Sequence, residues 1–122
     1  MSPDAPHVEF LWWDGCPSWE RALERLRAEM ADQGLDPAGI EIREVETEHA
    51  AEREGFVGSP TIRVDGRDVQ PLGEEPIGLT CRLYRLRDGR VSPLPDPADL
   101  RDALAAGLAG TGDERASQGA AS

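Results

Sequence analysis

The sequence predicts an α/β domain, a three-layer α/β/α sandwich around a central mixed sheet of four or five strands. Two observations lead to this prediction. Segments with strand and helix patterns alternate through the first half of the chain, an order typical of a sheet covered by helices on both faces. The second half continues with a strand, a two-residue Asp65-Gly66 turn and another strand, and it closes with an amphipathic helix. The turn indicates an antiparallel hairpin.

The first predicted elements are a strand and a helix. Residues 7–13, HVEFLWW, are rich in β-formers, and their apolar run suits a strand buried on both faces. Pro17 is favoured at the first position of a helix. From there apolar residues recur at helical spacing as far as Met30, and Gly34 is the expected C-terminal cap.

A second strand and a short helix follow. Residues 40–46 alternate between apolar and charged side chains, as a half-buried strand does. Thr47 can cap a helix over residues 48–54, and Gly55 can end it.

The later elements are shorter until the last helix. The Pro- and Gly-rich residues 71–80 predict a loop, and residues 81–86 fit a further strand that enters a turn, although a helix is also compatible there. The final helix has Asp96 as its cap and Pro97 at its first position, and one stripe of the helix carries Leu100, Leu104 and Leu108.

Composition limits the classes of function. The net charge of the 122-residue chain is −11, which disfavours nucleic acids and anionic membranes as partners. No apolar run is long enough to span a bilayer, and the N-terminus lacks a signal-peptide pattern, so we expect a cytoplasmic protein. We expect residues 1–6 to be a flexible leader, 7–109 one domain and 110–122 a disordered tail.

Two short motifs stand out, and each contains a proline. In FLWWDGCPSW (10–19) a predicted strand, a turn, Cys16 and Pro17 follow one another, and in VGSPTI (57–62) a proline precedes a predicted strand. In this order, the motifs resemble the thioredoxin-like superfamily over about residues 7–109. The resemblance implies that Cys16 is the attacking cysteine. It also implies that Pro60 follows a cis peptide bond beside Cys16, and that Ser59, Pro60 and Thr61 position a bound substrate.

The first motif departs from the family pattern at two positions. Trp19 stands where the resolving cysteine of a C-x-x-C motif would be, so the motif is C-P-S-W. Phe10 stands where thioredoxins proper keep a buried acid. Ordinary dithiol cycling within this motif is therefore not expected.

Cys16 and Cys81 are the candidate catalytic residues. A thiol near a helix N-terminus meets unpaired N–H groups and the positive end of the helix dipole, and both favour the thiolate. We expect only a modest effect at Cys16, because Asp14 and Glu20 oppose it. Cys81 could resolve a mixed disulfide if its loop lies over this region. The alternatives are a small residue at a turn for Cys16 and a buried strand cysteine for Cys81.

Three functions fit these residues. The first is an atypical thiol–disulfide oxidoreductase of monothiol or Cys16–Cys81 type, acting on a protein or small-molecule thiol or disulfide without a cofactor. The second is a thiolate protein that handles a soft metal or an organomercurial compound. The third is a non-catalytic interaction module. Pro17, Trp13 and Trp19 are further candidates for positioning a substrate, since Trp13 or Trp19 can form an apolar rim around Cys16. His7 and His49 fit a surface role among acids, so we expect no resident metal.

Overall fold

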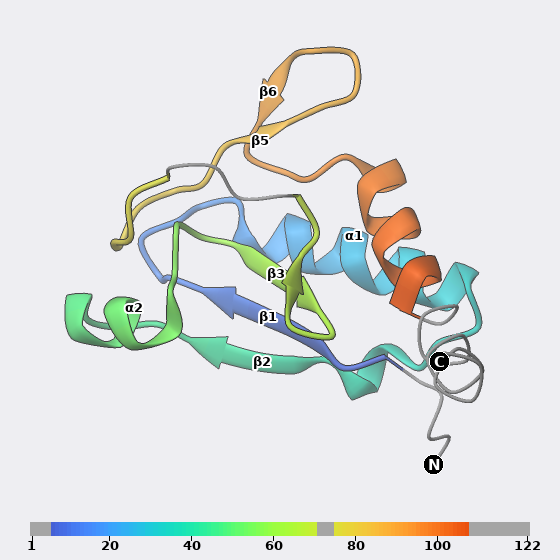
Figure 1. Cartoon of the computed structure of the whole chain (residues 1–122), viewed down its shortest axis with the longest axis horizontal. Coiled ribbons are helices and arrows are strands. Elements are labelled where there is room, and N and C mark those ends of the chain that lie inside the picture. Colours follow the sequence, from blue (N-terminus) through green and yellow to red (C-terminus); the bar gives the residue numbers. More distant parts are fainter. Residues whose placement is uncertain (1–5, 71–74, 108–122) are drawn as a thin grey trace, which may run out of the picture.

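A four-stranded mixed sheet forms the centre of the fold in a computed structural model that describes residues 6–70 and 75–107 (Figure 1). The strand order is β2-β1-β3-β4, in which β1 is parallel to β2 and antiparallel to β3, and β3 is antiparallel to β4. The bounds, in that order, are Glu41–Glu44, Val8–Trp12, Thr61–Val64 and Arg67–Asp68. The prediction of a mixed sheet with four strands is therefore confirmed.

The strand expected near residues 81–86 does not join this sheet. It is reduced to β5 (Tyr84–Arg85), which pairs with β6 (Val91–Ser92) in a separate two-stranded sheet. Figure 1 shows this hairpin extending away from the main sheet.

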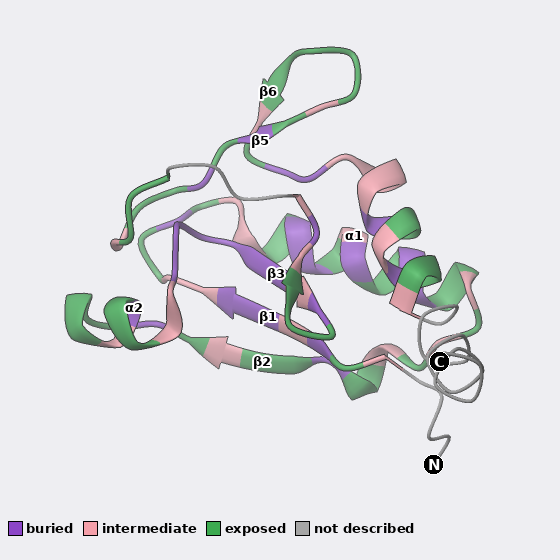
Figure 2. Cartoon of the chain, viewed as in Figure 1, coloured by how far each residue is buried: buried purple, intermediate pink, exposed green. Residues whose placement is uncertain are grey.

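Helices cover both faces of the sheet. On one face, α1 (Trp19–Asp32) and the C-terminal helix (residues 97–107) pack against β1 and β3 through one apolar cluster. The members that the structure buries completely include Phe10, Leu26, Ile62, Leu100 and Leu104. On the other face, α2 (Glu48–Glu54) contributes to a smaller cluster of Leu11, Val45, Ala51 and Phe56. Figure 2 shows the result, with burial concentrated in β1 and β3 and with β2 largely exposed at the sheet edge.

Local sequence signals act where they were expected. The Thr47 hydroxyl accepts a hydrogen bond from the Ala50 N–H at 3.0 Å and caps α2, which ends at Gly55 in the left-handed conformation (φ 66°). Asp65 and Gly66 both have positive φ values and form the tight turn between β3 and β4. The Asp96 carboxylate accepts from the Ala98 N–H at 2.9 Å at the start of the last helix.

The start of α1 differs from the prediction. Pro17 lies in a turn before the helix, and α1 begins two residues later, at Trp19. The first helical hydrogen bond runs from the Ala22 N–H to the Ser18 carbonyl at 3.1 Å, which makes Ser18 the N-cap residue. Cys16 consequently lies in the connection from β1 to α1 rather than at the helix terminus itself.

Some expectations concern residues outside the described ranges. These are the tail 110–122, Leu108, residues 1–5 of the leader and residues 71–74 of the predicted loop. Among the described residues, none of the helices is both long and apolar enough to cross a membrane. A short 3-10 helix, η1 (Pro37–Gly39), connects α1 to β2.

Candidate functional site

Cys16 is held in a tight turn directly after β1. Its N–H donates to the Trp13 carbonyl at 3.0 Å, which closes the turn over Asp14 and Gly15. Gly15 leaves room for the Trp13 indole ring, because a Cβ atom at that position would lie 2.5 Å from the ring. The turn leaves Cys16 only 2% exposed.

The loop before Pro60 lies against Cys16, as the sequence predicted. The Cys16 thiol donates to the Ser59 carbonyl at 3.4 Å, and the Ser59 hydroxyl accepts from the Trp13 N–H at 3.0 Å. The Ser59–Pro60 peptide bond is cis. Tyr84, which is fully buried, donates its hydroxyl to the Pro60 carbonyl. These contacts bring the two sequence motifs together.

The same loop brings Cys81 into the site. Residues 80–82 run beside Ser59, whose N–H donates to the Thr80 carbonyl at 2.8 Å and whose carbonyl accepts from the Arg82 N–H at 2.9 Å. Gly58 permits this close approach, since it has a φ of 128° and a Cβ atom there would lie 2.9 Å from the Cβ of Arg82. The backbone of one serine thus contacts the Cys16 thiol and both neighbours of Cys81.

The two cysteines are adjacent but not bonded covalently. Both are free. The backbone of Ser59 binds the Cys16 thiol and both neighbours of Cys81, which brings the two cysteines together, and the pKa of Cys81 responds to Cys16. Their exposure differs sharply, because Cys81 is exposed whereas Cys16 is buried. Cys81 is therefore not the buried strand cysteine that was one alternative reading of the sequence.

The electrostatics of the pair disfavour a second negative charge. The pKa of Cys81 is raised, first by the partial burial of its thiol, and then by the hydrogen bond to Cys16 and the charge that Cys16 can carry. Cys81 therefore stays protonated to higher pH than an ordinary thiol.

Arg82 anchors the segment that carries Cys81. Its guanidinium forms a two-pronged ion pair with Asp68, at 2.6 and 2.8 Å, and lies 4.3 Å from the centre of the Tyr84 ring. Both charged side chains are almost completely buried. Sequence reasoning missed this pair, because Arg82 resembles any other of the thirteen arginines when its contacts are unknown.

The remaining predicted site residues surround the turn. Pro17 is exposed, and Trp13 and Trp19 are half-buried, so neither tryptophan is fully removed from the surface. Trp19 stacks on Trp12, with ring centres 4.1 Å apart, instead of covering Cys16. The Thr61 hydroxyl is buried and donates to the Gly58 carbonyl at 2.7 Å, so it supports the loop from within.

Comparisons of the chain with protein-family models, with curated proteins and with solved structures give no match.

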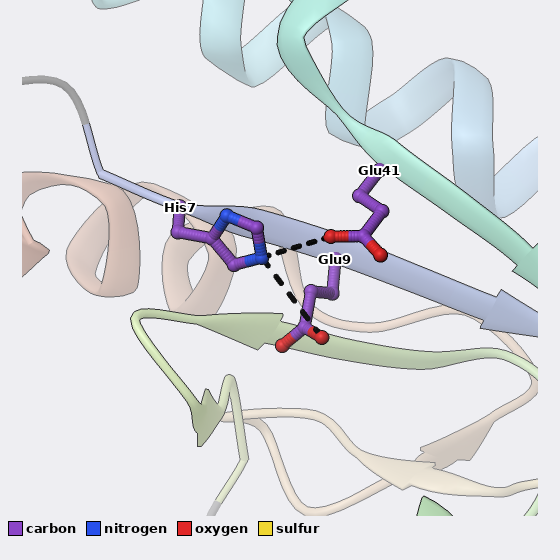
Figure 3. Close-up of side chains that lie close together, drawn as sticks. All are labelled: His7, Glu9 and Glu41. Carbon is purple, nitrogen blue, oxygen red and sulfur yellow. Dashed lines mark ion pairs between the residues drawn. The ribbon is translucent and has the colours of Figure 1, made fainter.

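A second group of polar side chains lies at the beginning of β1, at the opposite end of that strand from Cys16. His7, Glu9 and Glu41 place ligand-type atoms within 4.8 Å of one another (Figure 3). His7 Nε2 is 3.0 Å from a Glu41 oxygen, and the guanidinium of Arg43 bonds to Glu9, Glu41 and Glu54. Because Arg43 already neutralises these carboxylates, the group is best described as an ion-pair network. The signal in the sequence was the two-residue spacing of His7 and Glu9 on one strand face.

Proposed function

We propose that this chain is a thiol–disulfide oxidoreductase with a thioredoxin-like fold, in which Cys16 and Cys81 form the redox pair. The observation that carries the proposal is that two free cysteines, which lie far apart in the sequence, meet at the backbone of Ser59. The fold assignment is supported by the strand order β2-β1-β3-β4 and by the contact between Cys16 and the Ser59 carbonyl.

The pair can carry out a two-electron exchange with a disulfide. One thiolate attacks a substrate sulfur, forms a mixed disulfide and releases the first substrate thiol. The second thiol then attacks the mixed disulfide, which forms the Cys16–Cys81 bond and releases the second substrate thiol. The substrate disulfide is reduced, the pair is oxidised, and the protons of the pair pass to the released thiols. An external dithiol reverses the oxidation of the pair.

A redox equilibrium tests the proposal. Wild-type protein is equilibrated with mixtures of reduced and oxidised dithiothreitol, and peptide mapping without reduction measures the peptide that contains linked Cys16 and Cys81. We expect one two-electron transition in wild type and none in Cys16→Ser, Cys81→Ser or the double variant. A natively folded wild-type protein that forms no linked peptide in the most oxidising mixture contradicts the proposal.

A soft-metal thiolate site is the second candidate, and the same adjacency of two free thiols favours it. Soft ions such as Cu(I) and Hg(II) prefer sulfur and accept few ligands. The predicted result is stoichiometric binding of one ion per chain, with loss of binding in each single cysteine variant. A metal titration with no disulfide exchange supports this candidate, and disulfide exchange without tight metal binding supports the first.

A further inference from the structure

We propose that Cys81 is the thiol that meets the substrate, that Cys16 completes the exchange from inside, and that the substrate is a small disulfide rather than a polypeptide. This inference rests on the proposed function and reverses the order of attack that the sequence resemblance implies. The exposures of the two thiols and the backbone contacts of Ser59 support it.

The exposures of the two thiols point to Cys81 as the first to react. A thiol must approach a disulfide sulfur directly, so its rate of exchange depends on access. Cys16 is 2% exposed, and its thiol faces the Ser59 carbonyl. Cys81 is exposed and lies beside Ser59, the residue whose carbonyl the Cys16 thiol contacts. A disulfide from solvent can therefore reach Cys81 while Cys16 is still covered.

The backbone beside Cys16 is already paired within the chain. An extended polypeptide that presents a disulfide at this point would need the N–H and carbonyl of Ser59 for strand-like pairing. Those two groups bond to Thr80 and Arg82, at 2.8 and 2.9 Å. The chain's own residues 80–82 therefore occupy the place of a bound strand, and Cys81 occupies the place of a substrate cysteine.

This segment is firmly attached on both sides of Cys81. Before it, the Gly78 N–H donates to the Phe56 carbonyl at 3.0 Å. After it, the buried guanidinium of Arg82 binds Asp68 and reaches the Gln70 carbonyl at 3.4 Å. A polypeptide would have to displace these contacts, whereas a small disulfide needs only to reach Cys81, which is an exposed residue.

The reaction balances with these roles. The Cys81 thiolate attacks one sulfur of a small disulfide, a Cys81 mixed disulfide forms, and one small thiol leaves. Cys16 then attacks the Cys81 sulfur, the internal disulfide forms, and the second small thiol leaves with the proton from Cys16. A small dithiol reduces the internal disulfide by attack at exposed Cys81, and it leaves as its own cyclic disulfide.

Single-cysteine variants test the order of attack. Reduced Cys16→Ser and Cys81→Ser proteins are mixed with cystamine, and mass spectrometry follows the mixed disulfide with time. We expect Cys81, in Cys16→Ser, to react at least about tenfold faster than Cys16 does in Cys81→Ser, because of access. The same two variants in concentrated urea are the control, and there the rates should differ little.

A polypeptide arm tests the substrate class. The rates at which the Cys16→Ser protein reacts with cystamine and with insulin are measured. Each rate is divided by the rate at which reduced glutathione reacts with the same disulfide, and the two normalised rates are compared. We expect the normalised rate with insulin to be at least about tenfold lower, since the approach of a chain is blocked. Equal normalised rates overturn the substrate class.

The outcomes separate this inference from the proposed function. Equal native rates for the two cysteines, or a faster Cys16, overturn the role of Cys81 even when wild type forms the internal disulfide. If wild type forms no internal disulfide with cystamine, the proposed function fails and the order of attack fails with it. A faster Cys81, together with complete internal disulfide formation in wild type, supports both.

Discussion

Arg82 and Asp68 form a two-pronged ion pair in which the side chains are only 3% and 5% exposed. The pair joins the last strand of the main sheet to the residue that follows Cys81. Its position means that the buried charges and the placement of Cys81 beside Cys16 depend on one segment of backbone.

Asp68→Ala is expected to destabilise the fold by about 3–5 kcal/mol, because it leaves the buried guanidinium of Arg82 without its partner. Urea denaturation measures the free energy of unfolding. Asp102→Ala is the matched control, since it removes an exposed carboxylate that pairs with Arg87 at 2.7 Å, and it should have no measurable effect. Similar decreases in the free energy of unfolding of the two variants would show that the Arg82–Asp68 pair contributes little to stability.

Gly58→Ala is expected to destabilise the fold by about 1–3 kcal/mol and to separate the two cysteines. The new methyl group meets Arg82 at 2.9 Å, and the φ of 128° is unfavourable for alanine. The measurements are thermal unfolding and the rate at which Cys16 is alkylated in the native protein, which should rise. Gly39→Ala is the control, because nothing lies within 4 Å of its added Cβ. An unchanged alkylation rate in Gly58→Ala would contradict the tight packing of residues 80–82.

Cys16→Ala is expected to lower the pKa of Cys81 towards that of an ordinary thiol. Two of the causes that raise this pKa, the hydrogen bond to Cys16 and its charge, disappear with the Cys16 sulfur, while the partial burial remains. A raised pKa keeps Cys81 protonated to higher pH. Removing the contribution of Cys16 should therefore increase the thiolate fraction of Cys81 near neutral pH. The pH dependence of Cys81 alkylation by iodoacetamide, followed by peptide mass spectrometry, measures this shift. A pH midpoint that stays the same or moves upward would refute the coupling.

Arg43→Lys is expected to destabilise the sheet edge by about 1–3 kcal/mol. One guanidinium bonds to Glu9, Glu41 and Glu54, and a single ammonium group cannot reproduce its planar set of donors. Arg67→Lys is a suitable control, since residue 67 is exposed. Denaturation curves that coincide for the two variants would mean that a lysine at position 43 supports the three carboxylates as well as the arginine does.

Much of the fold could be predicted because its signals are local. The caps at Thr47 and Asp96 and the turn at Asp65-Gly66 depend on contacts between residues only a few positions apart. The start of α1 was misjudged by two residues, because Pro17 suits a turn before a helix as well as the first helical position.

The candidate site was harder to predict because its parts are distant in sequence. The sequence indicated that Cys16 and the Ser59-Pro60 loop would meet, and it left the position of Cys81 open. That position depends on the pairing of residues 80–82 with Ser59 and on the Arg82–Asp68 ion pair. Neither this pairing nor this ion pair has a local sequence pattern. For the ion pair the reason is that a buried arginine and an exposed one look the same in sequence.

The adjacency of Cys16 and Cys81 also has a consequence for chain entropy. A covalent bond between them would close a loop of about 65 residues that contains most of the main sheet, and loops of that size restrict the unfolded chain by about 4 kcal/mol. Oxidation of the proposed pair would therefore stabilise the domain by a covalent cross-link. The resistance of the protein to heat would then report the redox state of its surroundings.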